Sequence, residues 1–449
     1  MMDLANGPVA KTLIIFSTPM AAANLLQTVY SIVSMIVMGQ FVGRIGLAAV
    51  SIGSDITSIL SFVAMSVASA GQIIISQFMG AGDRKSVTKA IGTMFTVIML
   101  SSVVLSLLGI VCIDPIINAM NTPAEARKMA REFCVIGFSG MFFIYGYNLV
   151  SAILRGMGDS RHPLIFIAIA SVSNLVLSLV FVAWFKWEAI GAALAMVAGQ
   201  AISFIASMVL LYRKKEEFGF DFKLKSFKVD GFILRRLLKL GIPMVLQNAA
   251  INFSMMYVNS FIYAYGDVAS AVTGIGSRVG YIMNVICGSL STGGSAMVGQ
   301  SLGAGKTERI PAVIRFSLIV NAAFATLFSS VIIIFPRWLF GLFNSDVEVL
   351  DMAMTYVMPA VLNSFGFAVR SPFFALINGV GHPKLNLLVG LLDGVVCRIG
   401  LALLLGIVVG MGIRGFWYGS VLAGYIPLFI GGYYFISGKW KTQKLLIEA

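Results

Sequence analysis

Long runs of apolar residues, separated by short polar intervals, fill almost the whole of this chain. A run of about 20 apolar residues is long enough to cross the hydrocarbon core of a membrane as an α-helix. The pattern therefore predicts an all-α integral membrane protein with twelve transmembrane helices. These helices are expected near residues 13–38, 46–79, 90–113, 131–154, 164–186, 189–212, 237–264, 268–299, 313–335, 351–377, 384–409 and 413–437.

The two halves of the chain repeat each other. Residues 52–82 and 275–305 share Ile-Gly-Ser at the start and Gln-x-x-Gly-Ala-Gly at the end, 223 residues apart. Pro-Met-x-x-x-Asn, which begins at Pro19, recurs at Pro243, and Gly-x-Gly recurs at Gly379 after Gly156. Constant spacing over several blocks indicates an internal duplication. Because each half holds six spans, an even number, the sequence predicts parallel repeats with the same orientation in the membrane.

The duplication predicts two pseudo-symmetric six-helix bundles with a V-shaped central cleft between them. We expect an N-terminal lobe over 1–212, a basic cytoplasmic linker over 213–236 and a C-terminal lobe over 237–449. A linker of this composition suits the anionic surface of the inner leaflet, and a regulatory binding segment is the alternative. Rocking one bundle against the other would expose the cleft to each side in turn, as in a carrier.

Composition and charge agree with a membrane location. Hydrophobic residues make up 58% of the chain and charged residues 11%, against about 25% charged in soluble proteins. The net charge of +13 comes from basic loops on one side: that side and the tails hold 22 Lys and Arg, the other side holds seven, and three lie within spans. This asymmetry predicts a multi-pass protein of the plasma membrane (the inner membrane of bacteria) with both termini cytoplasmic, and it argues against nucleic-acid binding.

Few residues suit catalysis or metal binding. The four cysteines lie in or beside apolar runs without CxxC spacing, and both histidines directly precede a proline. The Gly-Ala-Gly turns at Gly80 and Gly303 are expected to end helices with a left-handed glycine, since no strand precedes them and no Gly-Lys-Ser/Thr follows in register. We therefore expect no enzyme, no metal site, no ATP-driven pump and no cofactor beyond a coupling ion.

Five ionisable residues lie well inside predicted spans: Asp55, Arg278, Arg370, Asp393 and Arg398. Each would cost at least about 2.5–3.5 kcal/mol facing lipid, so each should face protein or water. Asp55 and Arg278 occupy the same position of the repeat. Five residues correspond to about 140° around an α-helix, so Asp393 and Arg398 are poorly placed to pair, and Arg370 or Arg278 is the expected partner of Asp393.

Two interpretations of these charges remain open. They are either structural pairs that fix the register of helices, or groups that respond to a transported ion or substrate. Asp55 is the only acid well inside the spans of its half, so we expect it to point into the cleft and to act in transport.

Polar side chains form a stripe on two corresponding spans. In the seventh span the stripe follows helical spacing, and the first span carries its counterpart. Such groups either bond between helices or line a water-filled cavity, and the symmetry favours lining. The expected cavity-lining residues are Asn24, Gln27, Thr28, Ser34, Gln247, Asn248, Asn252, Asn259 and Asn363.

The duplicated motifs resemble the multidrug and toxic compound extrusion (MATE) family. The resemblance rests on the early Pro-Met with Asn, LLQTVYSIVSMIVMGQFVGRIGLAAVSIG, ISQFMGAGD, and LRGMGDSRHP with its partner INGVGHP, and it covers essentially the whole chain. It implies twelve helices in two lobes, a central cavity, and efflux of amphipathic, often cationic compounds against inward flow of H⁺ or Na⁺.

The chain departs from the family pattern at the coupling carboxylates. One branch carries an aspartate in the first span, where this chain has Ser34, and serine does not titrate near neutral pH. Another branch places acids in the seventh and tenth spans, where this chain offers Asn252, Asn259 and Asn363. Asp55 becomes the leading candidate for the missing role.

The sequence thus favours a secondary-active multidrug exporter that works by alternating access, as a monomer, on a small amphipathic substrate. An anionic Asp55 suits an organic cation, whereas three arginines suit an anionic or zwitterionic compound. A flippase for a lipid-linked or anionic amphipathic substrate is one alternative, since arginines grip phosphates well. A receptor or scaffold without transport is the other.

Overall fold

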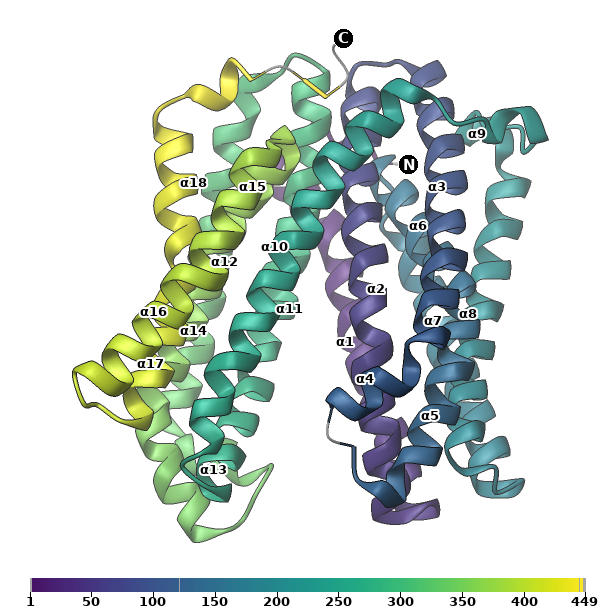
Figure 1. Ribbon diagram of the computed structural model, residues 1–449. Helices are drawn as coiled ribbons and strands as arrows, with labels where there is room; N and C mark the ends of the chain where they lie inside the picture. The colour runs from purple at the N-terminus through teal and green to yellow at the C-terminus, as the bar shows by residue number, and fades with distance from the viewer. Residues whose placement is uncertain (1, 121, 444, 447–449) are drawn as a thin grey trace. The chain divides into compact units, whose positions relative to one another are not determined.

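The computed structural model describes residues 2–120, 122–443 and 445–446, and this part of the chain contains helices but no β-strand (Figure 1). It divides into two compact units. Unit 1 holds Met2 and Thr18–Gly241, and unit 2 holds Asp3–Ser17 and the chain from Ile242 onward. This division differs from the predicted lobes, because 3–17 belong to unit 2 and 213–236 belong to unit 1.

Unit 1 is organised around one long helix, α2, which packs against α3, α5 and α6, while α7 packs against α8. The elements are α1 (Val9–Phe41, in this unit from Thr18), α2 (Gly43–Gly80), α3 (Arg84–Val111), α4 (Ile113–Ala119), α5 (Ala124–Ser139), α6 (Met141–Gly156), α7 (Arg161–Ser178), the π-helix η1 (Leu179–Trp184), α8 (Glu188–Arg213), α9 (Lys215–Phe218) and the 3₁₀-helix η2 (Leu224–Phe227).

The predicted linker is folded against α3. The hydroxyls of Thr88 and Thr96 donate to the carbonyls of Gly219 and Phe227, at 2.8 and 2.5 Å. The ring of Phe95 stacks on Phe220 and meets Phe227 edge to face. These contacts make the segment an integral part of unit 1.

Unit 2 is organised around α14, which packs against α11 and α12. Its elements are α10 (Gly231–Tyr263, in this unit from Ile242), α11 (Asp267–Gly303), the 3₁₀-helix η3 (Thr307–Arg309), α12 (Ile310–Ile334), α13 (Pro336–Gly341), α14 (Val347–Val380), α15 (Pro383–Val389), the π-helix η4 (Gly390–Cys397), α16 (Arg398–Leu403), the π-helix η5 (Leu404–Val408), α17 (Ile413–Ala423), α18 (Ile426–Ile436) and the 3₁₀-helix η6 (Lys439–Lys441).

The N-terminal segment is held by unit 2. The backbone N–H of Leu4, which is fully buried, donates to Gln300 Oε1 at 3.2 Å, and Arg309 Nη1 donates to the carbonyl of Gly7 at 2.9 Å. These bonds explain why the first residues belong with the second half of the sequence.

The helices account for all twelve predicted spans. Within the described residues, nine helical segments are long and apolar enough to cross a membrane, and α5 with α6 qualifies as one more span, bent by 48°. Helices α10 and α11 have 33 and 37 residues and supply the remaining two predicted spans. The chain is therefore a multi-pass membrane protein.

Glycine and proline mark matched positions in the repeats. Gly82 and Gly305 have φ of +72° and +71°, which confirms the predicted left-handed glycines where α2 and α11 end. The chain changes unit between Ser17 and Thr18 in α1, and between Gly241 and Ile242 in α10. Pro19 and Pro243 follow directly, inside these helices. Proline removes a backbone hydrogen bond there, so both helices bend most easily at the matched sites.

Candidate functional site

Asp55 lies on an exposed face of α2. The exposed residues Ser51, Ser54 and Ile59 share that face. Among the described residues, no hydrogen bond or ion pair reaches the Asp55 carboxylate; only its backbone carbonyl is bonded, by Ser58 Oγ at 2.8 Å. A carboxylate within a membrane span that has no protein partner is available to water, an ion or a ligand.

Arg278 lies on the corresponding face of α11. Ser277, Tyr281 and Asn284 are exposed beside it. No carboxylate in the described part of the chain forms an ion pair with Arg278, so the expectation that it might hold Asp393 is wrong. The two copies of the repeat therefore expose the same face, with a negative charge in unit 1 and a positive charge in unit 2.

The predicted polar stripes are largely exposed. On α1, Gln27 is exposed while Asn24 and Thr28 are half-buried; on α10, Asn248 and Asn252 are exposed. Asn259, a turn or two further along α10, is half-buried. Thr28 Oγ1 and Asn252 Nδ2 donate to carbonyls of their own helices, at 2.9 and 2.8 Å. These two side chains therefore form hydrogen bonds within their own helix and do not link it to a neighbouring helix.

Three predicted lining residues lie deeper. Gln247 is only 6% exposed, and Asn363 is half-buried next to Gly280. Ser34, also half-buried, donates through Oγ to Asn174 Oδ1 at 3.1 Å. The position that carries an acid in one branch of the resembling family therefore holds half of a neutral hydrogen-bonded pair.

Asp393 and Arg398 form a buried ion pair. Arg398 Nη2 lies 2.7 Å from Asp393 Oδ1, and the side chains are 7% and 0% exposed for Arg398 and Asp393. Arg398 Nη1 also donates to the carbonyl and hydroxyl oxygens of Ser420, at 2.9 and 3.2 Å. The prediction that Arg370 or Arg278 would pair with Asp393 is wrong.

The π-helix η4 explains why Asp393 pairs with Arg398 and not with the predicted partner. Residues 390–397 form η4, in which the backbone hydrogen bonds join residues five apart, whereas an α-helix joins residues four apart. A π-helix therefore stacks positions i and i+5, which an α-helix would place about 140° apart. One carboxylate oxygen, Asp393 Oδ2, and Arg398 Nε have no hydrogen-bond partner among the described residues. The pair thus retains one free acceptor and one free donor.

Arg370 lies near the pair without joining it. Its guanidinium lies 4.2 Å from the ring centre of Phe367, a cation–π contact, and it interacts electrostatically with Asp393 and Arg398. Two positive charges and one negative charge thus occupy this part of unit 2.

Sequence reasoning missed several polar partners. Asn174 and Ser420 carried no visible signal, because a single Asn or Ser in a span is common. Arg155 donates through Nε to Gln72 Oε1 at 2.9 Å; it stands in the Leu-Arg-Gly motif, at the end of a predicted span, and was not counted among the charges within spans. Among the described residues, no three His, Cys, Asp or Glu side chains gather in a group that could hold a metal ion.

Comparisons with known proteins point to one family. The family model described as MatE matches residues 19–180 and 243–404. The chain is 27% identical over 448 residues to "Probable multidrug resistance protein YpnP" of Bacillus subtilis, covering 99% of both chains. It is 27% identical to "Probable multidrug resistance protein YoeA" of the same organism, covering 98% of this chain and 96% of the other.

The fold matches solved structures over the same length. A structure titled "Outward-facing conformation of a multidrug resistance MATE family transporter of the MOP superfamily" superposes with a TM-score of 0.88 at 22% identity, covering 99% of this chain and 98% of that one. This similarity concerns the fold.

Proposed function

The chain belongs to the MatE family, and we propose that it is a secondary-active exporter of small amphipathic organic compounds, driven by inward flow of H⁺ or Na⁺. The names of the relatives YpnP and YoeA, both probable multidrug resistance proteins, support this activity. The match over both halves supports a transporter that works through its duplicated bundles, without catalysis. The comparisons do not favour a flippase.

The observation that carries the proposal for this chain is the unpaired carboxylate of Asp55. The neutral pair of Ser34 and Asn174 cannot exchange a proton near neutral pH. Asp55 is exposed, lies within a membrane span, and has no partner among the described side chains. A group in that state responds to an ion or to a cationic substrate at low structural cost, so we assign Asp55 the coupling role. Asp393, whose carboxylate is already bonded to Arg398, is the second candidate.

The proposal is tested by transport in proteoliposomes with an imposed proton or sodium gradient. We expect gradient-driven movement of an organic cation such as tetraphenylphosphonium by the unaltered protein, and its loss in Asp55→Asn with normal expression and melting temperature. Asp114→Asn is the matched control, because Asp114 is an exposed acid of unit 1 that lies outside the predicted spans and is paired with Arg131.

The outcomes separate the parts of the proposal. Normal coupled transport by Asp55→Asn would remove Asp55 from the mechanism and leave Asp393 to be tested. No gradient-driven flux of cationic or anionic dyes by the unaltered protein would reject the exporter itself.

We further propose that the protein acts as a single chain in the plasma membrane with both termini in the cytoplasm. The basic surplus on one side of the spans supports this orientation. Single cysteines introduced at Lys441 and Arg337 of a cysteine-free variant test it. A membrane-impermeant maleimide added to whole cells should label the second and spare the first, and the reverse pattern would invert the topology.

A further inference from the structure

The chain after α18 folds back across one end of unit 2. Trp440 is 1% exposed, stacks on Phe435 and donates through Nε1 to the Phe435 carbonyl at 3.0 Å. Leu446 is 5% exposed and lies so close to Gly381 that a Cβ there would meet its side chain at 2.4 Å. These two anchors hold residues 437–443 and 445–446, which we call the C-terminal strap, against the start of α15.

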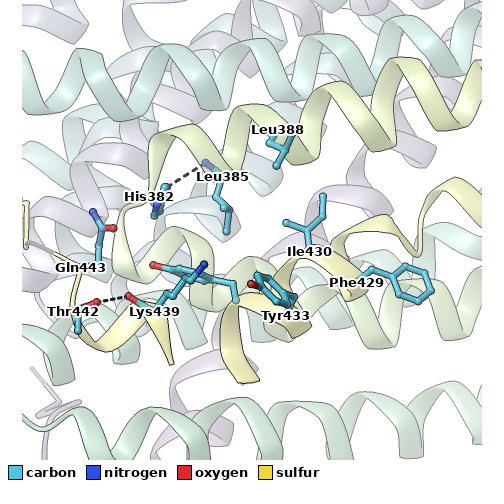
Figure 2. Close-up of a pocket in the computed structure, with 10 residues that line it drawn as sticks. His382, Leu385, Leu388, Phe429, Ile430, Tyr433, Lys439, Thr442 and Gln443 are labelled. Carbon is cyan, nitrogen blue, oxygen red and sulfur yellow. Dashed lines mark hydrogen bonds between the residues drawn. The ribbon is translucent and has the colours of Figure 1, made fainter. Parts of the chain in front are cut away.

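The strap borders an open cavity of about 700 Å³ between α15 and α18 (Figure 2). One part of the lining is apolar and the other part is polar. The apolar part consists of Leu385, Leu388, Phe429 and Ile430; the polar part consists of His382, Tyr433, Tyr434, Lys439, Thr442 and Gln443.

The polar part contains a buried hydroxyl without a partner. Tyr434 is 5% exposed, and its hydroxyl makes no hydrogen bond within the described structure. Burying a hydroxyl without a hydrogen bond is unfavourable, so a ligand that accepts this bond is favoured. Tyr434 is one of the residues that line the cavity, which is large enough to admit such a ligand.

Two other polar side chains of the lining, His382 and Lys439, also carry donors. His382 Nδ1 accepts the N–H of Leu385 at 3.2 Å, as the dashed line in Figure 2 shows. Burial lowers the pKa of His382, so the ring is neutral near pH 7 and carries its proton on Nε2. The Lys439 ammonium lies 5.4 Å from the ring centre of Tyr433 and forms no ion pair with a described residue. Among the residues that the structure describes, no Asp or Glu lines the cavity.

The cavity stands at the boundary of a membrane span. The apolar segment Ile413–Ile436 ends three residues before Lys439. Leu388 and Phe429, on the apolar part, are 44% and 67% exposed, so this part opens outward instead of into the core of the unit. Tyrosine beside lysine at the end of a span is typical of the headgroup region of a bilayer.

The same end of unit 2 is basic. Successive spans run in opposite directions, so alternate connections lie at one end. Among the described residues, the end that carries the cavity has a basic surplus, and the other end has an acidic surplus. The first holds Lys306, Arg309, Lys384, Lys439 and Lys441 against Asp3 and Glu308; the second holds Asp267, Asp346, Glu348 and Asp351 against Arg337 and Arg414. An anionic group is therefore attracted to the cavity and a cationic one is repelled.

We propose that this cavity binds one anionic phospholipid of the cytoplasmic leaflet. The phosphate and glycerol oxygens accept hydrogen bonds from Tyr434 and His382 and face the charge of Lys439, while an acyl chain lies along Leu388 and Phe429. The leaflet follows from the orientation proposed above, but the binding chemistry does not depend on transport.

Native mass spectrometry of the delipidated full-length protein with dioleoylphosphatidylglycerol tests the site. We expect Lys439→Gln to weaken binding of the first lipid about fivefold, since one lysine near an anionic headgroup contributes that much. Tyr434→Phe should weaken it about tenfold, because a bond to a charged acceptor is lost. Lys441→Gln is the matched control: Lys441 has the same charge, lies in the same 3₁₀-helix and does not line the cavity.

Two further probes define the ligand. Dioleoylphosphatidylcholine should bind at least fivefold more weakly than phosphatidylglycerol, and inorganic phosphate alone should neither bind detectably nor displace the lipid. Equal losses in Lys439→Gln and Lys441→Gln, or equal binding of both lipids, would overturn the proposal. Displacement by inorganic phosphate would show a free-anion site instead. None of these measurements depends on efflux, so the site and the proposed function fail independently.

Discussion

The two copies of the span that follows His-Pro differ in the course of their helices. Gly191 lies 35 positions after Gly156 in unit 1, and Gly415 lies 36 positions after Gly379 in unit 2. The later glycines match in structure, because a Cβ on either would meet the backbone of the preceding span, at Phe181 and Leu405 respectively. The second copy therefore holds one additional residue between equivalent positions.

The π-helix η4 accommodates that additional residue and has no counterpart within α7, which is α-helical from Arg161 to Ser178. Both copies end in a π-turn, η1 and η5, but only the second has a π-segment at its centre. That segment brings Asp393 and Arg398 together. Unit 1 uses the neutral pair of Ser34 and Asn174 instead. The two copies keep the same order of helices, but the polar side-chain pairs within them differ.

The largest expected effect concerns this ion pair. Asp393→Asn should lower the free energy of unfolding by about 3–5 kcal/mol, because it leaves Arg398 charged, buried and without its partner. Thermal unfolding in detergent measures the loss. The matched change in unit 1, Asn174→Ala, removes a neutral hydrogen bond and should cost only about 0.5–1.5 kcal/mol.

A double variant separates pairing from packing. Asp393→Leu with Arg398→Met should recover most of the stability, since an apolar pair can replace a buried ion pair. If Asp393→Asn lowered the free energy of unfolding no more than Asn174→Ala does, the charged pair of unit 2 would contribute no more to stability than the neutral pair of unit 1. That result would contradict the proposed difference between the units.

A smaller effect is expected from the close packing of η4 on α10. A Cβ on Gly394 would lie 2.9 Å from the backbone at Ala250 and Ile251, which cannot move aside as a flexible side chain can. Gly394→Ala should therefore cost about 1–3 kcal/mol, again measured by thermal unfolding.

Gly400→Ala, six residues along, is the control for that change. No atom lies within 4 Å of a Cβ there, so alanine should leave the stability unchanged or raise it slightly. Equal melting temperatures for the two alanine variants would contradict close packing along η4.

The smallest expected difference concerns the start of α10, the duplicate of α1. Asp230 Oδ1 accepts the N–H groups of Phe232 and Ile233, at 3.0 and 3.2 Å. The bond from Ile233, with Lys89 nearby, lowers the pKa of Asp230 from its usual 3.8. Asp230→Ala should destabilise the first turn of α10 by about 1 kcal/mol near pH 7.

The sign of the pH dependence follows from that lowered pKa. The stabilisation is present above pH 3.8 and is lost as the pH falls through the lower, folded pKa, where the unaltered protein and the variant should converge. Hydrogen exchange of the first turn of α10 measures this, and a difference that persists below that pKa would contradict the capping role.

Sequence predicted the spans and their duplication because apolar runs and repeated motifs are directly legible. It missed helical residues outside the apolar runs: α10 begins at Gly231, not near 237, since Arg235, Arg236 and Lys239 continue a helix without being apolar. The apolar pattern predicted a single helix over 131–154, whereas α5 and α6 meet at Gly140 with a bend of 48°.

The candidate site was predictable in its residues but not in its pairings. The charges at Asp55 and Arg278 are exposed, as the cost of burying them unpaired requires. The partner of Asp393 was not predicted because the angle of about 140° between residues five apart holds only for a regular α-helix. No residue propensity distinguishes the π-segment Gly390–Cys397 from its α-helical counterpart.

The π-helix η4 also bears on how such a chain can evolve. Deleting one residue there would restore an α-helix and turn everything that follows by about 100°, which would separate Arg398 from Asp393. Recombination between the two halves, which tends to keep repeats alike, would remove the extra residue and so break the ion pair. Once the extra residue is present, the two halves can no longer exchange sequence here without loss of the ion pair, so they are expected to diverge independently.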